Sequence, residues 1–202
     1  MKNYLCIDGK KIELTKEQVT QLKRSVASAP TRPLSKKKVG DTFKIGKYEF
    51  IVLEHSKETT AVILKDFLCN SKFSEMDCDF KSSIVKKTLE KFADEIVGII
   101  GSHNLVKHGV DLTSNDGLKD YGRDLAKVSL LTDDLYRRYV EILDDFKLDE
   151  WWWLATPFST EKHGYTKFVM CVSHAGNIGI NYCDYDGGVR PFCILKSDIF
   201  VS

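Results

Sequence analysis

Asn181, Asp184 and Asp186 lie close together along the sequence near the end of this 202-residue chain, and their side chains could supply oxygen ligands to calcium. Calcium is a hard cation that prefers several carboxylate and carbonyl oxygens. A simpler interpretation is a polar turn that leads into Gly187–Gly188, since asparagine, aspartate and glycine are common turn residues. We adopt the interpretation as a polar turn, and we predict no bound metal and no cofactor.

Other ligating and nucleophilic residues show no recognised spacing. His103, His108, His163 and His174 have no thiol or carboxylate at a zinc-binding distance along the chain, so we expect them on the surface. The six cysteines, at positions 6, 69, 78, 171, 183 and 193, form no C-x-x-C pair and lie in or beside apolar segments. This pattern favours reduced core thiols in a reducing cytosol. Phosphate-loop, G-x-S-x-G and dinucleotide motifs are absent, so we predict a cytoplasmic protein that is not an enzyme.

All three tryptophans lie in one run, Trp151–Trp153, and a Gly-Val-Arg-Pro segment follows at 188–191. Aromatic faces can stack on sugars or on nucleic-acid bases. If the run is a strand, however, Trp152 faces one side of the sheet while Trp151 and Trp153 face the other. At least one of these rings then belongs to the core, and we interpret Trp152 and Trp153 as structural.

Arg190 lies between Val189 and Pro191 in an expected core strand. A guanidinium is tolerated there only if it meets a carboxylate or several backbone carbonyls. Asp184, Asp186 or a carboxylate from a long loop could be its partner. We interpret Arg190 as a structural clamp.

The overall charge selects no partner. Thirty basic and 29 acidic residues give a formal charge of +1, which indicates neither a nucleic-acid binder nor an acidic mimic of one. No apolar run approaches the roughly 20 residues of a membrane-spanning helix. The sequence therefore predicts no nucleic-acid partner and no membrane, and it does not indicate an oligomeric state.

The first 29 residues predict a small arm. Residues 4–14 read as a hairpin around an Asp8–Gly9 turn, and Thr15 with Gln18 forms a capping-box pattern that begins a helix. Two prolines and three lysines then favour an extended linker over residues 30–38.

Residues 39–202 predict one α+β domain. Three strands at 42–45, 48–55 and 59–65 form a meander. Helical patterns begin after a cap at Ser82 or Ser83, and again at Thr132. Residues 102–122 read as a long loop. A short strand at 128–131 and strands at 168–173, 178–183 and 189–195 complete the pattern. Strands before and after two main helices imply an antiparallel sheet.

The run Trp-Trp-Leu-x-x-Pro followed by Gly-Val-Arg-Pro resembles an uncharacterised family of bacterial and prophage proteins marked by WWLRSP and GVRP. The segments Val39–Phe43, Tyr48–Leu53 and Val128–Thr132 also look like that family's "VGDTF", "Y-x-W-x-VL" and "LLS" stretches. The resemblance covers residues 39–202 and implies a C-type lectin-like fold, distantly related to formylglycine-generating enzymes. Ala155–Thr156 replaces the family's Arg-Ser, and Phe50 replaces its usual tryptophan.

The related oxidases bind copper through two thiols close together upstream of a Gly-Phe-Arg-Cys segment. Cys183 and Cys193 instead flank the Gly-Val-Arg-Pro segment at a different separation. A copper oxidase is therefore an alternative that this pattern does not favour.

Lectin-like folds present loops between their last strands, here residues 158–167 and 181–187. Tyrosine, asparagine and aspartate in such loops are typical of protein-binding surfaces. The expected binding residues are Tyr165, Asn181, Tyr182, Asp184, Tyr185 and Asp186. The sequence thus predicts a non-catalytic phage or prophage recognition protein with a protein partner, in its sharpest form an inhibitor of a host defence nuclease. A glycan-binding module is a further alternative.

Overall fold

In the computed structural model, residues 3–7, 10–27 and 32–202 are described. Strand β1 (Asn3–Ile7) pairs antiparallel with β2 (Lys10–Leu14), and helix α1 (Lys16–Ala27) follows. The expected capping box is present, because the Thr15 amide donates to Gln18 Oε1 (2.9 Å) and the Gln18 amide donates to Thr15 Oγ1 (3.2 Å). The predicted turn at Asp8–Gly9 lies outside the described residues.

The predicted linker is partly built into the folded body. Strand β3 (Arg32–Pro33) pairs with the C-terminal strand β17 (Phe200–Val201), and the short 3-10 helix η1 (Leu34–Lys36) follows. Leu34 is fully buried, and its amide donates to the carbonyl of Ile199 (2.8 Å). The extended prediction holds for Arg32–Pro33, which form a strand. It is wrong for residues 34–36, which form the 3-10 helix, because the buried Leu34 holds the chain against the core.

The first sheet contains the predicted meander of β4 (Thr42–Ile45), β5 (Tyr48–His55) and β6 (Thr59–Leu64). Strand β16 (Phe192–Lys196) continues the sheet beyond β6. Strands β8 (Leu105–Val106) and β11 (Val128–Ser129) both pair with β16. Every pair in this sheet is antiparallel, as expected.

The second sheet differs from the prediction in one strand pair. Its order is β14 (Ile178–Tyr182), β13 (Phe168–Val172), β12 (Trp152–Pro157), β15 (Asp186–Val189) and β7 (Cys69–Lys72). Strands β12 and β15 run parallel. The single strand expected over 189–195 is two strands, β15 and β16, interrupted at Arg190–Pro191. Proline has no amide hydrogen for a sheet, so the chain leaves one sheet there and enters the other.

The two main helices begin where the sequence indicates. Helix α2 (Ile84–Ile100) is capped by Ser83, whose hydroxyl accepts from the Lys86 amide, and it ends at Gly101 with φ of 84°. Helix α3 (Asp133–Leu143) is capped by Thr132. Short 3-10 helices lie at η2 (Phe80–Ser82), η3 (Asp144–Phe146) and η4 (Glu161–His163).

The predicted loop over 102–122 contains regular structure. Strand β9 (His108–Asp111) pairs antiparallel with β10 (Arg123–Ala126), and β8 lies just before it. These strands are short and mostly polar, so they lack the apolar alternation by which a strand is recognised.

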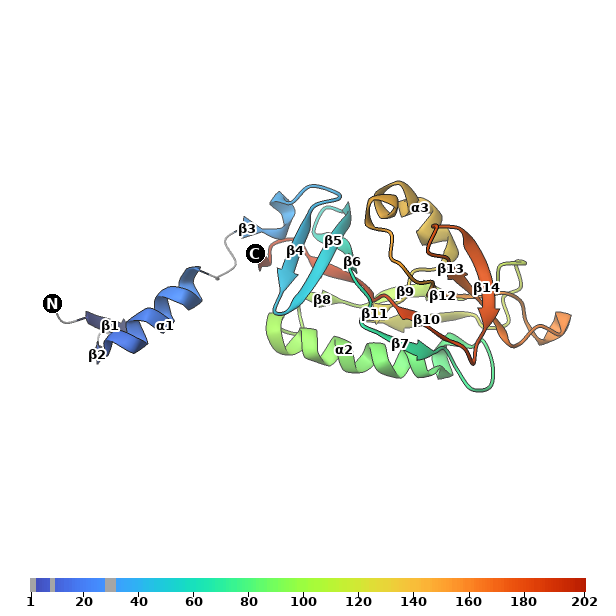
Figure 1. Cartoon of the computed structure of the whole chain (residues 1–202), viewed down its shortest axis with the longest axis horizontal. Helices are drawn as coiled ribbons and strands as arrows, with labels where there is room; N and C mark the ends of the chain where they lie inside the picture. Colours follow the sequence, from blue (N-terminus) through green and yellow to red (C-terminus); the bar gives the residue numbers. More distant parts are fainter. Residues whose placement is uncertain (1–2, 8–9, 28–31) are drawn as a thin grey trace.

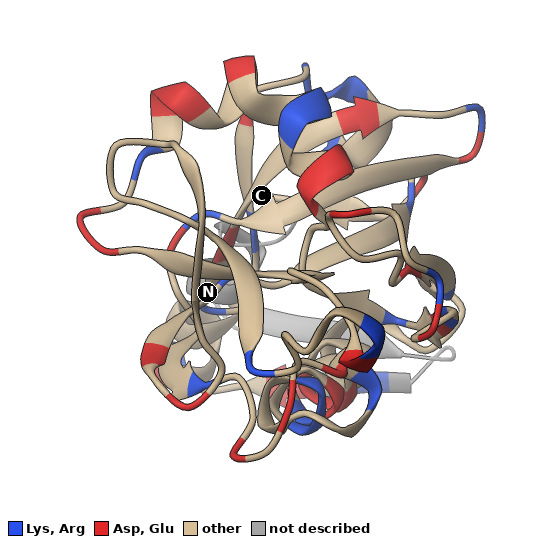
Figure 2. Cartoon of the chain, turned by 90° about the vertical axis from the view of Figure 1, so that its right-hand side faces the viewer, with Lys and Arg blue, Asp and Glu red and all other residues tan. Residues whose placement is uncertain are grey.

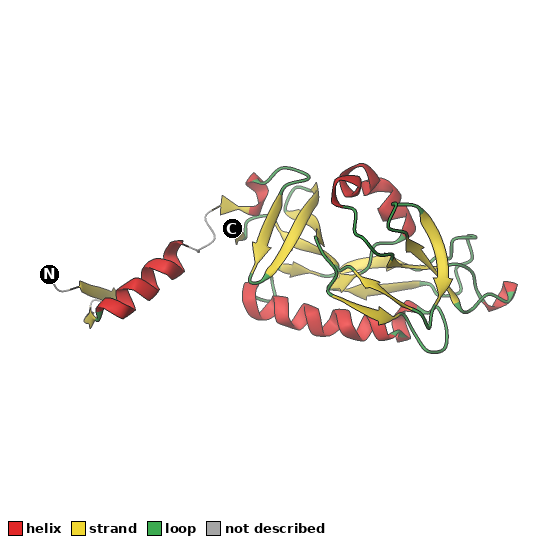
Figure 3. Cartoon of the chain, viewed as in Figure 1, coloured by secondary structure: helices red, strands yellow, loops and turns green. Residues whose placement is uncertain are grey.

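Helices α2 and α3 lie on opposite sides of the sheets (Figure 1). Alternate side chains of β5 point into two different hydrophobic cores. Phe50 and Val52 pack in the core that includes residues of α2. Ile51 and Leu53 pack in the core that includes residues of α3. The α+β class is confirmed, with helices and strands distributed as in Figure 3. Within the described residues, every helix is too short or too polar to cross a membrane.

Candidate functional site

The two sequence motifs are adjacent in space. Trp152 of β12 lies opposite Gly188 of β15, and the Gly188 amide donates to the carbonyl of Trp151 (3.1 Å). The aromatic run and the Gly-Val-Arg-Pro segment therefore form one structural unit. The loops between them extend from this point toward the right-hand end of the body in Figure 1.

The tryptophans alternate across the sheet as the strand pattern predicted. Trp152 is 3% exposed and meets Tyr136 of α3 edge to face, at 5.7 Å between ring centroids. Trp153 is fully buried on the other side, and its indole nitrogen donates to the carbonyl of Ser71 (2.9 Å). Trp151 is only partly buried and packs edge to face on Trp153 at 4.6 Å. Trp152 and Trp153 are core residues and offer no stacking platform.

Two glycines let these rings approach the backbone. A Cβ atom at Gly187 would overlap the Trp151 ring, and one at Gly188 would overlap the Phe67 ring. Any larger residue would force these aromatic groups to move.

Arg190 is a clamp, but its partners are backbone carbonyls. The guanidinium is 1% exposed and donates to the carbonyls of Leu64 (2.9 Å), Lys65 (3.0 Å) and Phe146 (3.3 Å). It also lies 5.3 Å from the centre of the Trp152 ring. Burial lowers the pKa of Arg190 to about 10. The carboxylates of Asp184 and Asp186, considered as partners from the sequence, do not bond to it within the described structure.

The predicted tyrosines meet on the surface. Phe158, Tyr165, Phe168, Tyr182 and Tyr185 form a continuous chain of ring contacts, which we call the aromatic ridge. Successive centroids lie 5.6 Å apart for Phe158 and Tyr165, 4.4 Å for Phe168 and Tyr182, and 5.5 Å for Tyr182 and Tyr185. Tyr165 is 50% exposed, Tyr182 44% and Tyr185 53%. The structure therefore joins three of the six predicted binding residues into one exposed surface.

The other three predicted residues border this ridge. Asn181 uses its side-chain oxygen to accept from the Tyr182 amide (3.0 Å). Asp184 and Asp186 are exposed on either side of Tyr185. Within the described residues, no group of three or more histidine, cysteine, aspartate or glutamate side chains is arranged to hold a metal ion.

An acidic side chain holds the loop that carries Tyr165. Asp116 accepts hydrogen bonds from the hydroxyls of Ser114 and Ser159, each at 2.5 Å, and lies 2.8 Å from His163 Nδ1. The hydrogen bonds from the two serines, with a smaller contribution from His163, keep the pKa of Asp116 far below its usual value. Residues 114–116 and 159–163 are thereby fastened together beside the ridge.

His108 is not the surface residue that the sequence suggested. Its Nε2 lies 2.9 Å from the Ser129 hydroxyl, and its ring packs against Phe192 at 5.3 Å. Burial lowers its pKa, since the charged ring would lose hydration.

An acidic groove beside the ridge escaped the sequence analysis. It has a volume of about 560 Å³. Figure 2 views the chain from the right-hand side of Figure 1 and colours the backbone of its acidic residues red. The lining of the groove consists of Asp77, Asp79, Asp120, Tyr121, Thr160, Glu161, Lys162 and Thr166. The acidic run before α2, from Glu75 to Asp79, was the available signal. The exposed Met76 lies in the same run.

A larger hollow, of about 670 Å³, lies at the opposite end of the body. Lys44, Ile99, His103 and Phe200 contribute to its lining. It contains none of the predicted loop residues, and its size alone does not identify it as a functional site.

The cysteines do not form the thiol pair that the copper alternative needs. Cys183 follows β14 in the second sheet, whereas Cys193 lies within β16 of the first. Both are buried, and burial raises the pKa of Cys193 to about 12. Cys69, Cys78, Cys171, Cys183 and Cys193 are free thiols.

Comparison with known proteins places most of the body in one family. A family model described as "Domain of unknown function (DUF6273)" matches residues 60–197, about two thirds of the chain. The match includes helices α2 and α3, the tryptophan run, the aromatic ridge and Arg190. No curated protein and no solved structure matches the chain.

Proposed function

This chain belongs to the DUF6273 family of domains of unknown function, and we propose that it is a non-catalytic recognition module that binds a protein through the aromatic ridge. One observation carries the proposal: rings from separate loops and strands meet in an uninterrupted exposed surface. Large exposed apolar patches on monomeric proteins commonly mark interaction sites.

The ridge has the chemistry of a protein-binding surface. Tyrosine combines a large apolar ring with a hydroxyl, and it loses little conformational freedom on binding because it has two side-chain torsions. Such residues are enriched among those that dominate binding energy. The ring contacts within the ridge also restrict each tyrosine before a partner arrives.

We also propose a C-type lectin-like architecture for residues 39–202. The ridge lies in and beside the loops between the closing strands, where that fold would present its variable surface. The resemblance to bacterial and prophage proteins supports a role in a phage or prophage, within the cytoplasm. Inhibition of a host defence nuclease is the sharpest form of this proposal.

Affinity capture from bacterial lysate tests the binding proposal. We expect the full chain to retain a specific partner, and we expect Tyr182→Ala with Tyr185→Ala to reduce capture at least tenfold, equivalent to about 1.4 kcal/mol. Adding Asp186→Ala tests whether the neighbouring carboxylate contributes.

The matched control is Phe200→Ala with Leu125→Ala, which removes two exposed apolar side chains outside the ridge. Capture should be unchanged in this variant. If the ridge variant keeps the same partners at the same yield, the ridge is not the binding surface. Retention on glycan arrays that depends on the same tyrosines would instead indicate sugar binding.

A further inference from the structure

We infer that the partner presents a basic segment, with an arginine or lysine side chain seated in the acidic groove beside the aromatic ridge. This inference rests on the proposed function, because the groove and the ridge share one surface. It adds the charge and the residue type of the partner, which the ridge alone does not specify.

The groove and the ridge are joined through the backbone. The Tyr165 amide donates to the carbonyl of Thr160 (3.3 Å), and the Cys78 amide donates to the carbonyl of Thr166 (2.8 Å). Thr160 and Thr166 line the groove, while Tyr165 between them belongs to the ridge. A peptide that crosses the ridge at Tyr165 can therefore place a side chain in the groove.

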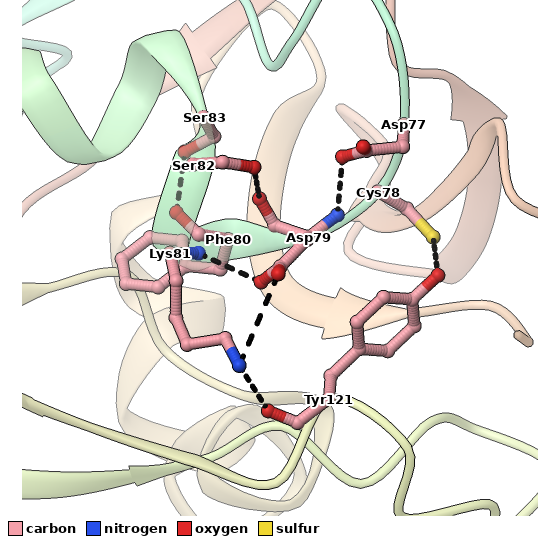
Figure 4. Close-up of polar contacts among 8 residues, drawn as sticks. All are labelled: Asp77, Cys78, Asp79, Phe80, Lys81, Ser82, Ser83 and Tyr121. Carbon is pink, nitrogen blue, oxygen red and sulfur yellow. Dashed lines mark hydrogen bonds and ion pairs between the residues drawn. The ribbon is translucent and has the colours of Figure 1, made fainter.

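The carboxylates of the groove are mostly uncompensated. Asp79 lies 3.9 Å from Lys81, whose ammonium also donates to the carbonyl of Tyr121 (2.7 Å; Figure 4). In contrast, Asp77, Asp120 and Glu161 form no ion pair within the described part of the chain. Lys162 is the single basic residue in the lining. The groove therefore carries net negative charge that a cation would neutralise.

A buried hydroxyl supplies a second, independent indication of a ligand. Thr160 is 1% exposed and lines the groove, yet its Oγ1 has no hydrogen-bond partner among the described residues. An unsatisfied buried polar atom costs about 1–3 kcal/mol. A guanidinium or ammonium group is rich in donors, and it would satisfy this oxygen only if a local shift first exposed the buried hydroxyl to the groove.

The negative charge continues along the ridge. Asp184 and Asp186 flank Tyr185, and both act electrostatically on Lys72, whose closest partner is Glu75. Aromatic faces attract cations, most often guanidinium groups, and nearby carboxylates strengthen that preference. This combination suits arginine or lysine and disfavours the phosphates of a nucleic acid.

A peptide titration of the full chain, followed by amide NMR shifts, tests the inference. The probe is acetyl-Gly-Arg-Ala-Arg-Gly-amide, and its counterpart with citrulline in place of arginine is the neutral control. We expect the arginine peptide to shift amides at 77–79, 120–122 and 160–166, with weaker binding at higher salt because screening shortens the reach of charge.

Asp77→Asn with Asp120→Asn should weaken arginine-peptide binding about tenfold. Asparagine keeps the oxygen through which Asp77 accepts from the Asp79 amide. Asp94→Asn with Glu141→Gln removes equal charge from exposed positions on the helices and should leave binding unchanged.

Equal binding of the citrulline peptide, shifts confined to other surfaces, or no loss in the groove variant would each overturn the basic-partner inference. The binding proposal would fail in a different measurement, the capture yield of the tyrosine variant. The two failures are thus distinguishable.

Discussion

Residues 151–192 contain two sets of aromatic side chains with opposite surroundings. Around Trp152, Trp153 and Arg190, the rings are enclosed, and the buried donors of Trp153 and Arg190 meet backbone carbonyls. In the aromatic ridge, Tyr165, Tyr182 and Tyr185 pack against one another and leave about half of each residue exposed. The same residue class therefore serves the core in one place and the surface in the other. Changes in the first set should affect folding, whereas changes in the second should affect binding alone.

The largest expected effect is that of Trp153→Ala. Removing this fully buried ring leaves a cavity beside Phe73 and removes the hydrogen bond to the Ser71 carbonyl. Truncation of a buried aromatic residue costs about 3–5 kcal/mol. Urea denaturation followed by circular dichroism measures the change, and a loss below about 1 kcal/mol would show that the site is not a tightly packed core.

Arg190→Met should destabilise the protein by about 2–3 kcal/mol. The substitution leaves three carbonyl groups without their guanidinium donor, but it also removes the cost of burying a charge. The net effect is therefore smaller than that of Trp153→Ala. Equilibrium unfolding is the measurement, with Lys162→Met as a control for removing an exposed cation. Equal stability of the two variants would contradict a clamping role for Arg190.

Asp116→Asn tests the support beneath the ridge. Its carboxylate accepts two serine hydroxyl bonds, and the amide cannot reproduce the full arrangement. We expect faster hydrogen exchange at residues 159–166, while residues 151–154 keep their protection. If the amides of both segments exchange faster, the loop beside the ridge and the tryptophan strand do not open independently of each other.

The same carboxylate gives the ridge support a defined pH dependence. Because the pKa of Asp116 is lowered in the folded protein, its contribution to stability is fully present above the unfolded value of about 3.9. That contribution is lost as the pH falls through the lower folded value. Carbon-detected NMR titration of the Asp116 carboxyl should give a midpoint below pH 3.9, the unfolded value. A midpoint at about 3.9 would show that Asp116 does not give the loop beside the ridge its pH dependence.

The smallest expected effect on stability is that of Tyr182→Ser with Tyr185→Ser. Both side chains are substantially exposed, so each replacement should change the free energy of unfolding by no more than about 0.5 kcal/mol. Urea denaturation of this pair provides the counterpart to Trp153→Ala. A loss of several kcal/mol would show that the ridge is also part of the core.

The sequence predicted the elements whose signals are local. Helices α2 and α3 were found because Ser83 and Thr132 cap them and their apolar residues recur at helical spacing. Strand β7 was missed because Cys69–Lys72 has little apolar pattern and forms a strand only by pairing with the distant β15. Strands β9 and β10 stabilise each other in the same way.

The candidate site was predictable to a similar degree. Tyr165, Tyr182 and Tyr185 were expected on loops, and the structure adds that Phe158 and Phe168 connect them. The partners of Arg190 were not predictable, because their carbonyls come from segments far away in sequence. The acidic groove likewise requires three separate segments to meet, and no local pattern encodes such a meeting.

The parallel contact between Trp152 and Gly188 holds the two ends of the segment 152–188 at one place in the second sheet. Loop residues far from that anchor can change in number at small entropic cost, about 0.6 kcal/mol for each doubling of a flexible loop. Within this segment, strands β13 and β14 keep their places in the sheet, whereas the loops at 158–167 and 183–185 can vary in length. A change in either loop would then alter the surface near the aromatic ridge and leave the buried strand β13 in place.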